Sequence, residues 1–398
     1  SGAIADAVPM QAQDTHTLET WFLALSTNLT ATLTEYGATL PHRPTPAPHG
    51  EAGWNSWYEL WDTVDAEAVL ANAEIAVRAF ANKLPSTTAK LRIVVDDGWQ
   101  REWGIWHANE KFPQGMEELA ATLGTQGYLP GIWLAPLLVS AETELARDNP
   151  DWFLGDADYF QLKHGQLKIL DVTHPEAAAH LRETIQRIVG WGYSLLKIDF
   201  LFAGTFPGQR HQPMTTMAAY KRALEIIREA AGPSVHLLAV GAPPLAGFQF
   251  VDSWRVGPDV ADENFGASWY FVQGTARTIA GRWPYCLRTL CDGDPPILRD
   301  FTAIQAQVSA WVAALAGGAF FLSDDLRGLT NDRLDWIVEP MVRLGTNGRP
   351  AHPFDQVPAE VPTSLVTQLG DQLAQKTRHQ IPALWVLPDG EQITLSLT

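Results

Sequence analysis

Cysteine is almost absent from this sequence, which contains only Cys286 and Cys291. Two thiols are too few to ligate a structural zinc ion or to build a disulfide framework, so we expect both to be buried free thiols. Apolar runs of about 18 residues are also absent, as is an amino-terminal basic segment followed by an apolar core. These absences favour a cytoplasmic protein, although the opening Ser-Gly leaves a removed signal peptide open.

Basic residues are scarce as well, with 28 Lys and Arg against 45 Asp and Glu and a formal net charge of -17. Such an acidic chain repels phosphate backbones and anionic membranes, so we expect neither a nucleic-acid nor a membrane partner. Tryptophan, in contrast, occurs 16 times. Its flat ring suits the apolar face of a sugar, although most tryptophans are simply core residues. The composition favours a neutral small-molecule partner, and it leaves oligomer formation open.

A chain of 398 residues, 46% of them hydrophobic, can bury a core large enough for one barrel and a small second domain. Residues 15–36 have a helical pattern, and the Pro-rich stretch at 41–50 is typical of an extended linker. Asp389-Gly390 near the end predicts a hairpin turn. We expect an N-terminal helical extension with its linker at 1–48, a barrel at 49–346 and a small C-terminal β domain at 347–398.

Eight short apolar segments, mostly separated by helical stretches, organise the middle of the chain. Helical periodicity is clearest at 175–190, where Pro175 suits the first turn, and at 220–231, where Gly232 would end the helix. The strand-like segments lack polar alternation, which is typical of parallel strands buried on both faces. They predict an α/β fold, the (β/α)8 or TIM barrel, with a doubly wound open sheet as the alternative. The predicted strands are GWNSWY, LRIVVDD, YLPGIWLAP, SLLKIDF, SVHLLAV, FVDSWRV, WPYCLRTL and GGAFFLSDD.

Carboxylates recur where these strands end, which in a barrel is the face that carries the active site. Lys197 and Asp199 are two residues apart in a strand, so both side chains should point into the mouth of the barrel. The lysine charge favours the ionised carboxylate that a covalent nucleophile requires. A Gly-Pro turn between Arg255 and Asp259 could bring a second carboxylate over the pocket. The carboxylates at strand ends are Asp96, Asp97, Asp199, Asp259, Asp324 and Asp325.

Each of these features also has a purely structural explanation. Lys197 and Asp199 could form a buried ion pair, and Asp96-Asp97 could open a loop through an Asx turn. Gly-Pro-Asp259 is common turn chemistry. For Asp324-Asp325 we prefer the structural explanation, in which they cap the following helix. The carboxylates taken together favour a site more than any one of them does.

Six motifs in a fixed order point to a known family. They are GWNSWY, VDDGWQ, FPQGMEELA, GYLPGIWLAP, GYSLLKIDFLFAG and SWRVGPD, within residues 53–345. Their order resembles the α-galactosidases, or melibiases, of glycoside hydrolase family 36 in clan D. The resemblance implies a retaining exo-glycosidase that releases terminal α-D-galactose from oligosaccharides of the melibiose and raffinose type. It also implies a covalent galactosyl-enzyme intermediate, and no metal or cofactor.

The resemblance assigns a role to each matching residue. Asp199 of the KIDF motif would be the nucleophile, and Asp259 of the RVGPD motif the acid/base. Two carboxylates about 5 to 5.5 Å apart give retention through such a pair. The residues implied for sugar binding are Asp96 and Asp97 at the hydroxyls of carbons 4 and 6, Trp57 and Trp133 as aromatic walls, and Lys197 and Arg255 as donors to hydroxyls.

The sequence departs from the family at one site position and leaves other functions open. Val240 stands where the family usually has a cysteine, which affects contacts near carbon 2 of the sugar. The large β-sandwich that precedes the barrel in many relatives does not fit into residues 1–48. The alternatives are a transglycosylase or an α-glycosidase of altered specificity, a metal-dependent barrel lyase with a lysine base, and a catalytically silent sugar-binding barrel.

Overall fold

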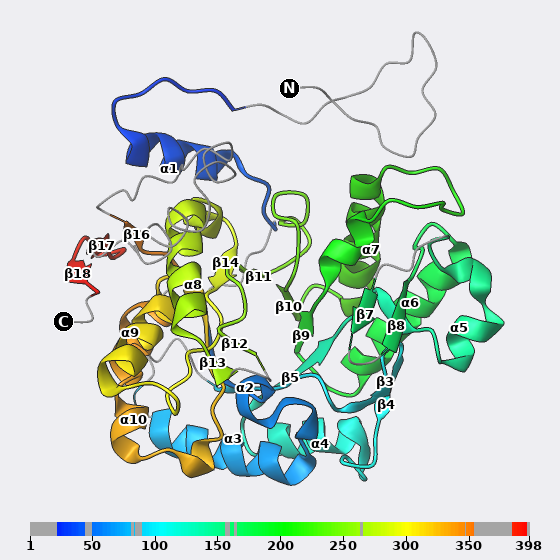
Figure 1. Cartoon of the computed structure of the whole chain (residues 1–398), viewed down its shortest axis with the longest axis horizontal. Helices are drawn as coiled ribbons and strands as arrows, with labels where there is room; N and C mark the ends of the chain where they lie inside the picture. Colours follow the sequence, from blue (N-terminus) through cyan, green and yellow to red (C-terminus); the bar gives the residue numbers. More distant parts are fainter. Residues whose placement is uncertain are drawn as a thin grey trace.

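The computed structural model describes residues 22–43, 50–80, 83, 90–155, 160–162, 165–262, 266–346, 348–353 and 384–395. Eight parallel strands form a closed barrel at its centre, in the order β1-β15-β14-β11-β10-β9-β5-β2, and β1 pairs with both β15 and β2 (Figure 1). The predicted (β/α)8 barrel is therefore confirmed, and the alternative of an open sheet is wrong. The barrel strands are β1 Glu51–Asn55, β2 Arg92–Val95, β5 Leu129–Leu134, β9 Leu195–Ile198, β10 His236–Ala239, β11 Ser253–Arg255, β14 Leu290–Asp292 and β15 Gly317–Leu322.

Helices cover the outside of the barrel, with α6 packed beside α7 and α8 beside α9 (Figure 1). The predicted apolar face of α6 is buried, and Pro175 occupies its first turn. Gly232 ends α7 with a φ of 78°, a conformation that glycine adopts without the penalty of a Cβ atom. The main covering helices are α3 Ala66–Phe80, α4 Gly115–Thr125, α6 Pro175–Gly190, α7 Thr216–Ala231, α8 Trp269–Arg282 and α9 Ala303–Ala314.

A small apolar cluster fills the barrel interior, separate from the larger core between strands and helices. Because side chains two residues apart in a strand point the same way, Lys197 follows Leu195 of this cluster into the interior. Lys197 is in register with Leu238 of the same cluster, so the charged group and this apolar layer lie next to each other in the interior. The cluster consists of Val94, Leu195, Leu238, Val240, Ala319 and Phe321.

The seventh barrel strand lies later in the chain than predicted. The segment WPYCLRTL at 283–290 was expected to form it, but a 3-10 helix, η4 Tyr285–Leu287, occupies its middle. The Trp283 N–H instead caps α8 by donating to the Ile279 carbonyl, and Pro284 has no N–H to contribute to a sheet. Apolar residues at a helix end can be as buried as those of a strand, so the apolar run placed the strand too early.

The two cysteines form a disulfide, so the prediction of free thiols is wrong. Cys286 belongs to η4 and Cys291 to β14, and their Cα atoms are 5.3 Å apart, which is within the usual range for a disulfide. Both side chains are buried as expected. Two cysteines are too few for a framework of several disulfides, but they are enough for one local disulfide when a turn brings the two thiols together.

Shorter strands and helices connect the barrel strands to the covering helices. The hairpin of β3 and β4 follows β2, and a three-stranded sheet of β6, β8 and β7 follows β5. The bounds of the small strands are β3 Gln100–Glu102, β4 Ile105–Ala108, β6 Leu138–Ser140, β7 Phe160–Leu162, β8 Gly165–Ile169, β12 Ala261–Asp262 and β13 Gly266–Ala267. The short helices are α2 Trp57–Leu60, η1 Trp61–Thr63, α5 Glu144–Asp148, η2 Pro150–Trp152, η3 Leu201–Thr205, η5 Leu326–Gly328, α10 Asn331–Asp335, α11 Val338–Pro340 and the π-helix η6 Met341–Gly345.

The segments outside the barrel match their predictions in part. One helix, α1 Leu29–Thr39, lies in the expected N-terminal extension. It begins later than predicted, because residues 22–28 are not helical, and residues 15–21 fall outside the described residues, as do residues 44–49 of the predicted linker. Strands β16 His352–Pro353, β17 Leu384–Val386 and β18 Gln392–Thr394 form a small antiparallel sheet. Asp389-Gly390 turns the β17–β18 hairpin, which confirms that prediction. The division into three domains stays a prediction.

Among the described residues, no helix is long and apolar enough to cross a membrane.

Candidate active site

All eight predicted site residues lie at the carboxyl ends of barrel strands or in the segments that follow directly. This face of a barrel is where loops can change without disturbing the strands, so chemistry is built there. The residues and their elements are Trp57 at the start of α2 after β1, Asp96 and Asp97 after β2, Trp133 in β5, Lys197 in β9, Asp199 after β9, Arg255 in β11 and Asp259 after β11.

Lys197 forms a buried ion pair with Asp96. Its Nζ lies 2.6 Å from Asp96 Oδ2, and Asn55 Nδ2 donates to the same oxygen at 2.7 Å. Burial acts to lower the pKa of Lys197, but the neighbouring Asp96 carboxylate outweighs it and the pKa is raised. The alternative of an ion pair between Lys197 and Asp199 is therefore wrong, because the ion pair is with Asp96. The charge of Lys197 still acts to lower the pKa of Asp199, as expected.

Asp97 is oriented by two side-chain donors from the segment after β2. Gln100 Nε2 donates to Asp97 Oδ1 at 2.6 Å, and Trp103 Nε1 donates to the same oxygen at 3.3 Å. Asp96 and Asp97 are both buried, and the Asp97 N–H donates to Asp96 Oδ1 at 3.0 Å. This last contact joins adjacent residues, so it is not the Asx turn of the structural alternative, which would reach the N–H two residues on. Two fixed acceptor groups side by side are suited to receive hydroxyl protons.

Asp199 is held by one side-chain donor and one backbone donor. Trp133 Nε1 donates to its Oδ2 at 3.1 Å, and the Phe200 N–H donates to its Oδ1 at 2.6 Å. Phe200 has a φ of 55°, in the left-handed region that non-glycine residues seldom occupy. Burial raises the pKa of Asp199, and the charge of Asp259 raises it further, against the opposing effects of Lys197 and the two donors.

Asp259 is the exposed member of the pair. Its side chain is 60% accessible and lies 3.2 Å from Arg255 Nη1. Arg255 itself is buried and contacts two further carboxylates: its Nε lies 2.9 Å from Asp292 Oδ2, and its Nη1 lies 2.5 Å from Asp294 Oδ1. One guanidinium is thus shared among three acidic groups, of which only Asp259 faces solvent.

A cavity of about 610 Å³ brings the two proposed catalytic aspartates into one space. Asp199, Asp259 and Arg255 line it together with Val240. Its remaining wall is mainly apolar and includes Phe200, Phe202, Pro243, Trp254 and Pro258. The other five predicted site residues are not among those that line this cavity.

The two predicted aromatic residues differ in their surroundings. Trp133 is buried against the Trp103 ring at 5.3 Å and reaches the site through its bond to Asp199. Trp57 is half-buried, and its ring makes an edge contact with Trp61 at 4.9 Å. The Trp57 N–H donates to Asn55 Oδ1, which ties the start of α2 to the residue that also bonds Asp96.

Asp292, Asp294 and Tyr58 belong to the site and were missed from the sequence. Asp292 ends β14 and Asp294 follows it, so both meet the criterion of a carboxylate at a strand end. They were overlooked because the seventh strand was placed at 283–290, whereas β14 spans Leu290–Asp292. The segment CDGDPP, with two aspartates and two prolines directly after an apolar run, was a signal that could have identified them. Tyr58 lies within the motif GWNSWY but had no feature that separated it from a core tyrosine.

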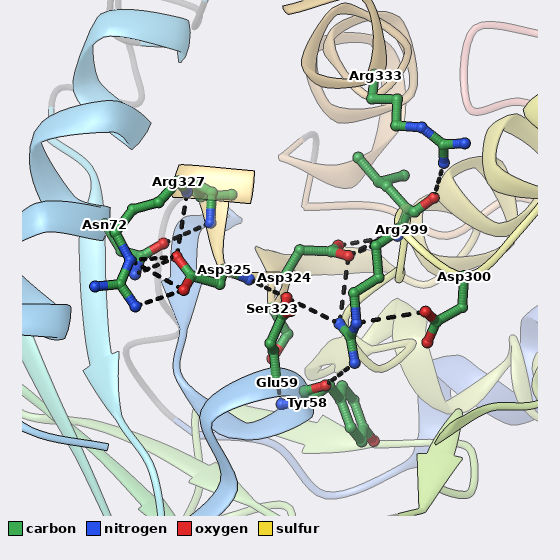
Figure 2. A network of polar contacts seen from close by, with 12 residues as sticks. Tyr58, Glu59, Asn72, Arg299, Asp300, Ser323, Asp324, Asp325, Arg327 and Arg333 are labelled. Carbon is green, nitrogen blue, oxygen red and sulfur yellow. Dashed lines mark hydrogen bonds and ion pairs between the residues drawn. The ribbon is translucent and has the colours of Figure 1, made fainter. Parts of the chain in front are cut away.

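Asp325 caps the helix that follows it, as we preferred, whereas Asp324 does not, and neither residue is among those that line the cavity (Figure 2). Asp325 caps η5 by accepting from the Arg327 N–H and also bonds Asn72. Asp324 is fully buried and accepts from the N–H groups of Leu298 and Arg299. Burial raises the pKa of Asp324 to about 6. These bonds attach the segment after β14 to the end of β15.

Fold and site define the class of the chain: a (β/α)8 barrel with an acidic site at the carboxyl ends of its strands. Residues 71–221 match the Melibiase family model.

Curated relatives in the comparison are α-galactosidases. α-Galactosidase AgaA from Geobacillus stearothermophilus is 30% identical over 105 residues, which cover 24% of this chain and 14% of AgaA. α-Galactosidase from Escherichia coli is 27% identical over 107 residues, covering 25% of this chain and 15% of that protein. The matched stretches thus span about a seventh of the length of these relatives. The resemblance to the α-galactosidases that the motifs predicted is confirmed.

Solved structures of α-galactosidases share the fold. The α-galactosidase TtGalA from Thermus thermophilus, in complex with p-nitrophenyl α-D-galactopyranoside, has a TM-score of 0.68 and 24% identity, covering 91% of this chain and 69% of that one. Its complex with stachyose has a TM-score of 0.65 and 26% identity, covering 78% and 68%. The family 36 α-galactosidase AgaA gives a TM-score of 0.53 at 16% identity, covering 73% and 41%.

Proposed function

We propose that this chain is a retaining exo-glycoside hydrolase that releases terminal α-D-galactose from oligosaccharides of the melibiose and raffinose type. The observation that carries the proposal is that Asp199 and Asp259, from the ends of β9 and β11, line the same cavity. The match to the Melibiase family model and the TtGalA complexes with a galactoside and with stachyose support the sugar class. No cofactor takes part in the proposed reaction.

Asp199 is proposed as the nucleophile that attacks the anomeric carbon. The donors from Trp133 and Phe200 fix the direction of its carboxylate, which lowers the entropic cost of reaching the attack geometry. They also favour the ionised form, which is the nucleophilic one. Attack expels the leaving oxygen and forms the galactosyl-enzyme ester.

Asp259 is proposed as the acid/base. It would first give its proton to the leaving oxygen and then remove a proton from the water that hydrolyses the ester. Its 60% exposed side chain suits a group that must exchange protons with solvent between the two steps. Asp199, in contrast, is held by donors inside the site, so the two carboxylates have different environments for their different roles.

Asp96 and Asp97 are proposed to select galactose through the hydroxyls at carbons 4 and 6. Both carboxylates are buried and already oriented by Lys197, Asn55 and Gln100. A sugar that lacks the axial 4-hydroxyl would leave such buried acceptors unpaired, which costs more than losing one exposed hydrogen bond. Lys197 would help by holding the Asp96 carboxylate in place.

A panel of p-nitrophenyl glycosides tests the proposed activity. We expect faster release from the α-galactoside than from the β-galactoside, the α-glucoside or the α-mannoside, with melibiose and raffinose cleaved to free galactose. Faster turnover of another glycoside would assign a different specificity to the same barrel. Transfer of galactose to a second sugar as the main product would support a transglycosylase instead.

A further inference from the structure

Asp294 combines several properties that are unusual for a residue outside the cavity. It is buried, it follows β14 by two residues, and its φ of 71° lies in the left-handed region. An aspartate tolerates this region better than most residues, but the conformation is still strained. Strain at a buried acidic residue beside a candidate site suggests that its position serves the site.

The contacts of Asp294 converge on the segment that carries Asp259. The Val260 N–H, directly after Asp259, donates to Asp294 Oδ2 at 2.8 Å. The Tyr58 hydroxyl donates to the same oxygen and lies 3.2 Å from the Val260 nitrogen. Asp294 and Tyr58 thus hold the backbone at the position next to the proposed acid/base.

Asp294 also competes with Asp259 for one nitrogen of Arg255. Arg255 Nη1 lies 2.5 Å from Asp294 Oδ1 and 3.2 Å from Asp259 Oδ1. Asp292 occupies the other side of the guanidinium through Nε. With two buried carboxylates already on Arg255, its charge is largely compensated before Asp259 is reached. An arginine without these two partners would attract the Asp259 carboxylate more strongly.

We propose that Asp294, together with Tyr58, is a positioning residue for the acid/base Asp259. It accepts from the Val260 N–H, which fixes the backbone next to Asp259, and it weakens the ion pair between Arg255 and Asp259. This inference rests on the proposed function, because it assigns Asp294 to the proton-donating half of that reaction. Burial raises the pKa of Asp294 to about 7, with Arg255 opposing the shift, which agrees with a carboxyl group in a tightly packed site.

The test exploits the fact that only poor leaving groups need a proton donor. We would measure kcat/KM, which reports the glycosylation step, for 2,4-dinitrophenyl α-galactoside and for methyl α-galactoside. General acid catalysis contributes roughly 10²- to 10⁴-fold, so Asp294→Ala should lose at least about tenfold more activity on the methyl than on the dinitrophenyl substrate. Asp294→Asn and Tyr58→Phe should shift this ratio in the same direction by smaller factors, because each removes only part of the contacts.

Asp324→Asn is the matched control. Like Asp294, Asp324 is a buried carboxylate beyond a barrel strand that accepts from two donors and contacts an arginine. Its donors are the N–H groups of Leu298 and Arg299, which do not adjoin Asp259, whereas Val260, a donor to Asp294, follows Asp259 directly. Its replacement should lower both activities by the same factor. Melting curves report which variants are folded, and if Asp294→Ala does not fold, Asp294→Asn and Tyr58→Phe decide by the same ratio.

Two failures are distinguishable. If the unmodified protein hydrolyses neither α-galactoside, the proposed function is wrong. If it hydrolyses both, and the folded Asp294 and Tyr58 variants lose the same factor on the two substrates as Asp324→Asn does, Asp294 is a structural residue and the inference is overturned.

Discussion

At the scale of single residues, the site depends on which donors each carboxylate receives. Asp97 accepts from Gln100 and Trp103, whereas Asp199 accepts from Trp133 and the Phe200 N–H. Donors to a carboxylate stabilise its charged form and restrict its direction at once. Changing one donor or acceptor should therefore alter binding or titration while leaving the barrel intact.

Asp97→Asn should lower kcat/KM for α-galactosides by about 2 to 3 kcal/mol of transition-state stabilisation, the usual cost of losing a charged hydrogen bond in a buried site. The amide keeps the size of the carboxylate but replaces one acceptor with a donor. Steady-state kinetics on p-nitrophenyl α-galactoside would measure the loss. A catalytic efficiency equal to that of the unmodified protein would show that Asp97 does not bind the substrate.

Trp133→Phe should move the acidic limb of the pH–rate profile to higher pH. Burial raises the pKa of Asp199, so the nucleophile becomes protonated, and activity falls, at a higher pH than for an ordinary aspartate. The Trp133 N–H opposes that rise, so removing it should raise the pKa of Asp199 further.

The matched control for this change is Trp54→Phe. The Trp54 N–H donates to the backbone carbonyl of Asp324 and not to Asp199, so the acidic limb of kcat/KM should stay where it is. An acidic limb at the same pH in both variants and in the unmodified protein would contradict the assignment of Asp199 as the group that titrates there.

At the scale of elements, helix caps and strand ends determine where each segment begins and ends. Helix α9 starts with a capping box, in which the Thr302 side chain accepts from the Gln305 N–H and the Gln305 side chain accepts from the Thr302 N–H. Helix α10 has Thr330 in the equivalent position, but its side chain makes no capping hydrogen bond. The two threonines therefore form a natural pair for comparison.

Thr302→Ala should lower the free energy of unfolding by about 1 kcal/mol, because it leaves helix N–H groups without an acceptor. Thr330→Ala should change it by only a few tenths of a kcal/mol, since no capping bond is lost. Denaturant unfolding curves of both variants would measure the difference. Equal effects would mean that the capping box of α9 does not contribute to stability.

The elements also show what the sequence could predict. All eight barrel strands were expected, because buried parallel strands leave uniformly apolar runs between helical segments. The seventh was misplaced because the end of α8 and η4 bury the same residue types as a strand. That error concealed Asp292 and Asp294, and with them the surroundings of Arg255. The disulfide was missed because spacing along the chain does not report how closely a turn brings two thiols together.

At the scale of the whole molecule, the barrel brings together residues that lie far apart in the chain. Lys197 reaches Asp96 across 101 positions, and Tyr58 reaches Asp294 across 236. Motifs could suggest that these residues share a site, and strand periodicity could predict that Lys197 points inward. Which carboxylate Lys197 contacts depends on the register between β2, β5 and β9, which the sequence pattern does not determine.

The most direct test of the account is the configuration of the products that azide forms with variants of the two aspartates. Asp259→Ala should still be galactosylated by substrates with good leaving groups and then stall, and azide, which needs no base, should release α-galactosyl azide after two inversions. Asp199→Gly cannot form the ester, and azide in the vacated space should give β-galactosyl azide by one inversion. Product configuration, read by NMR, reports both roles. Formation of the α-azide by the Asp199 variant and the β-azide by the Asp259 variant would reverse the assignment and contradict the account.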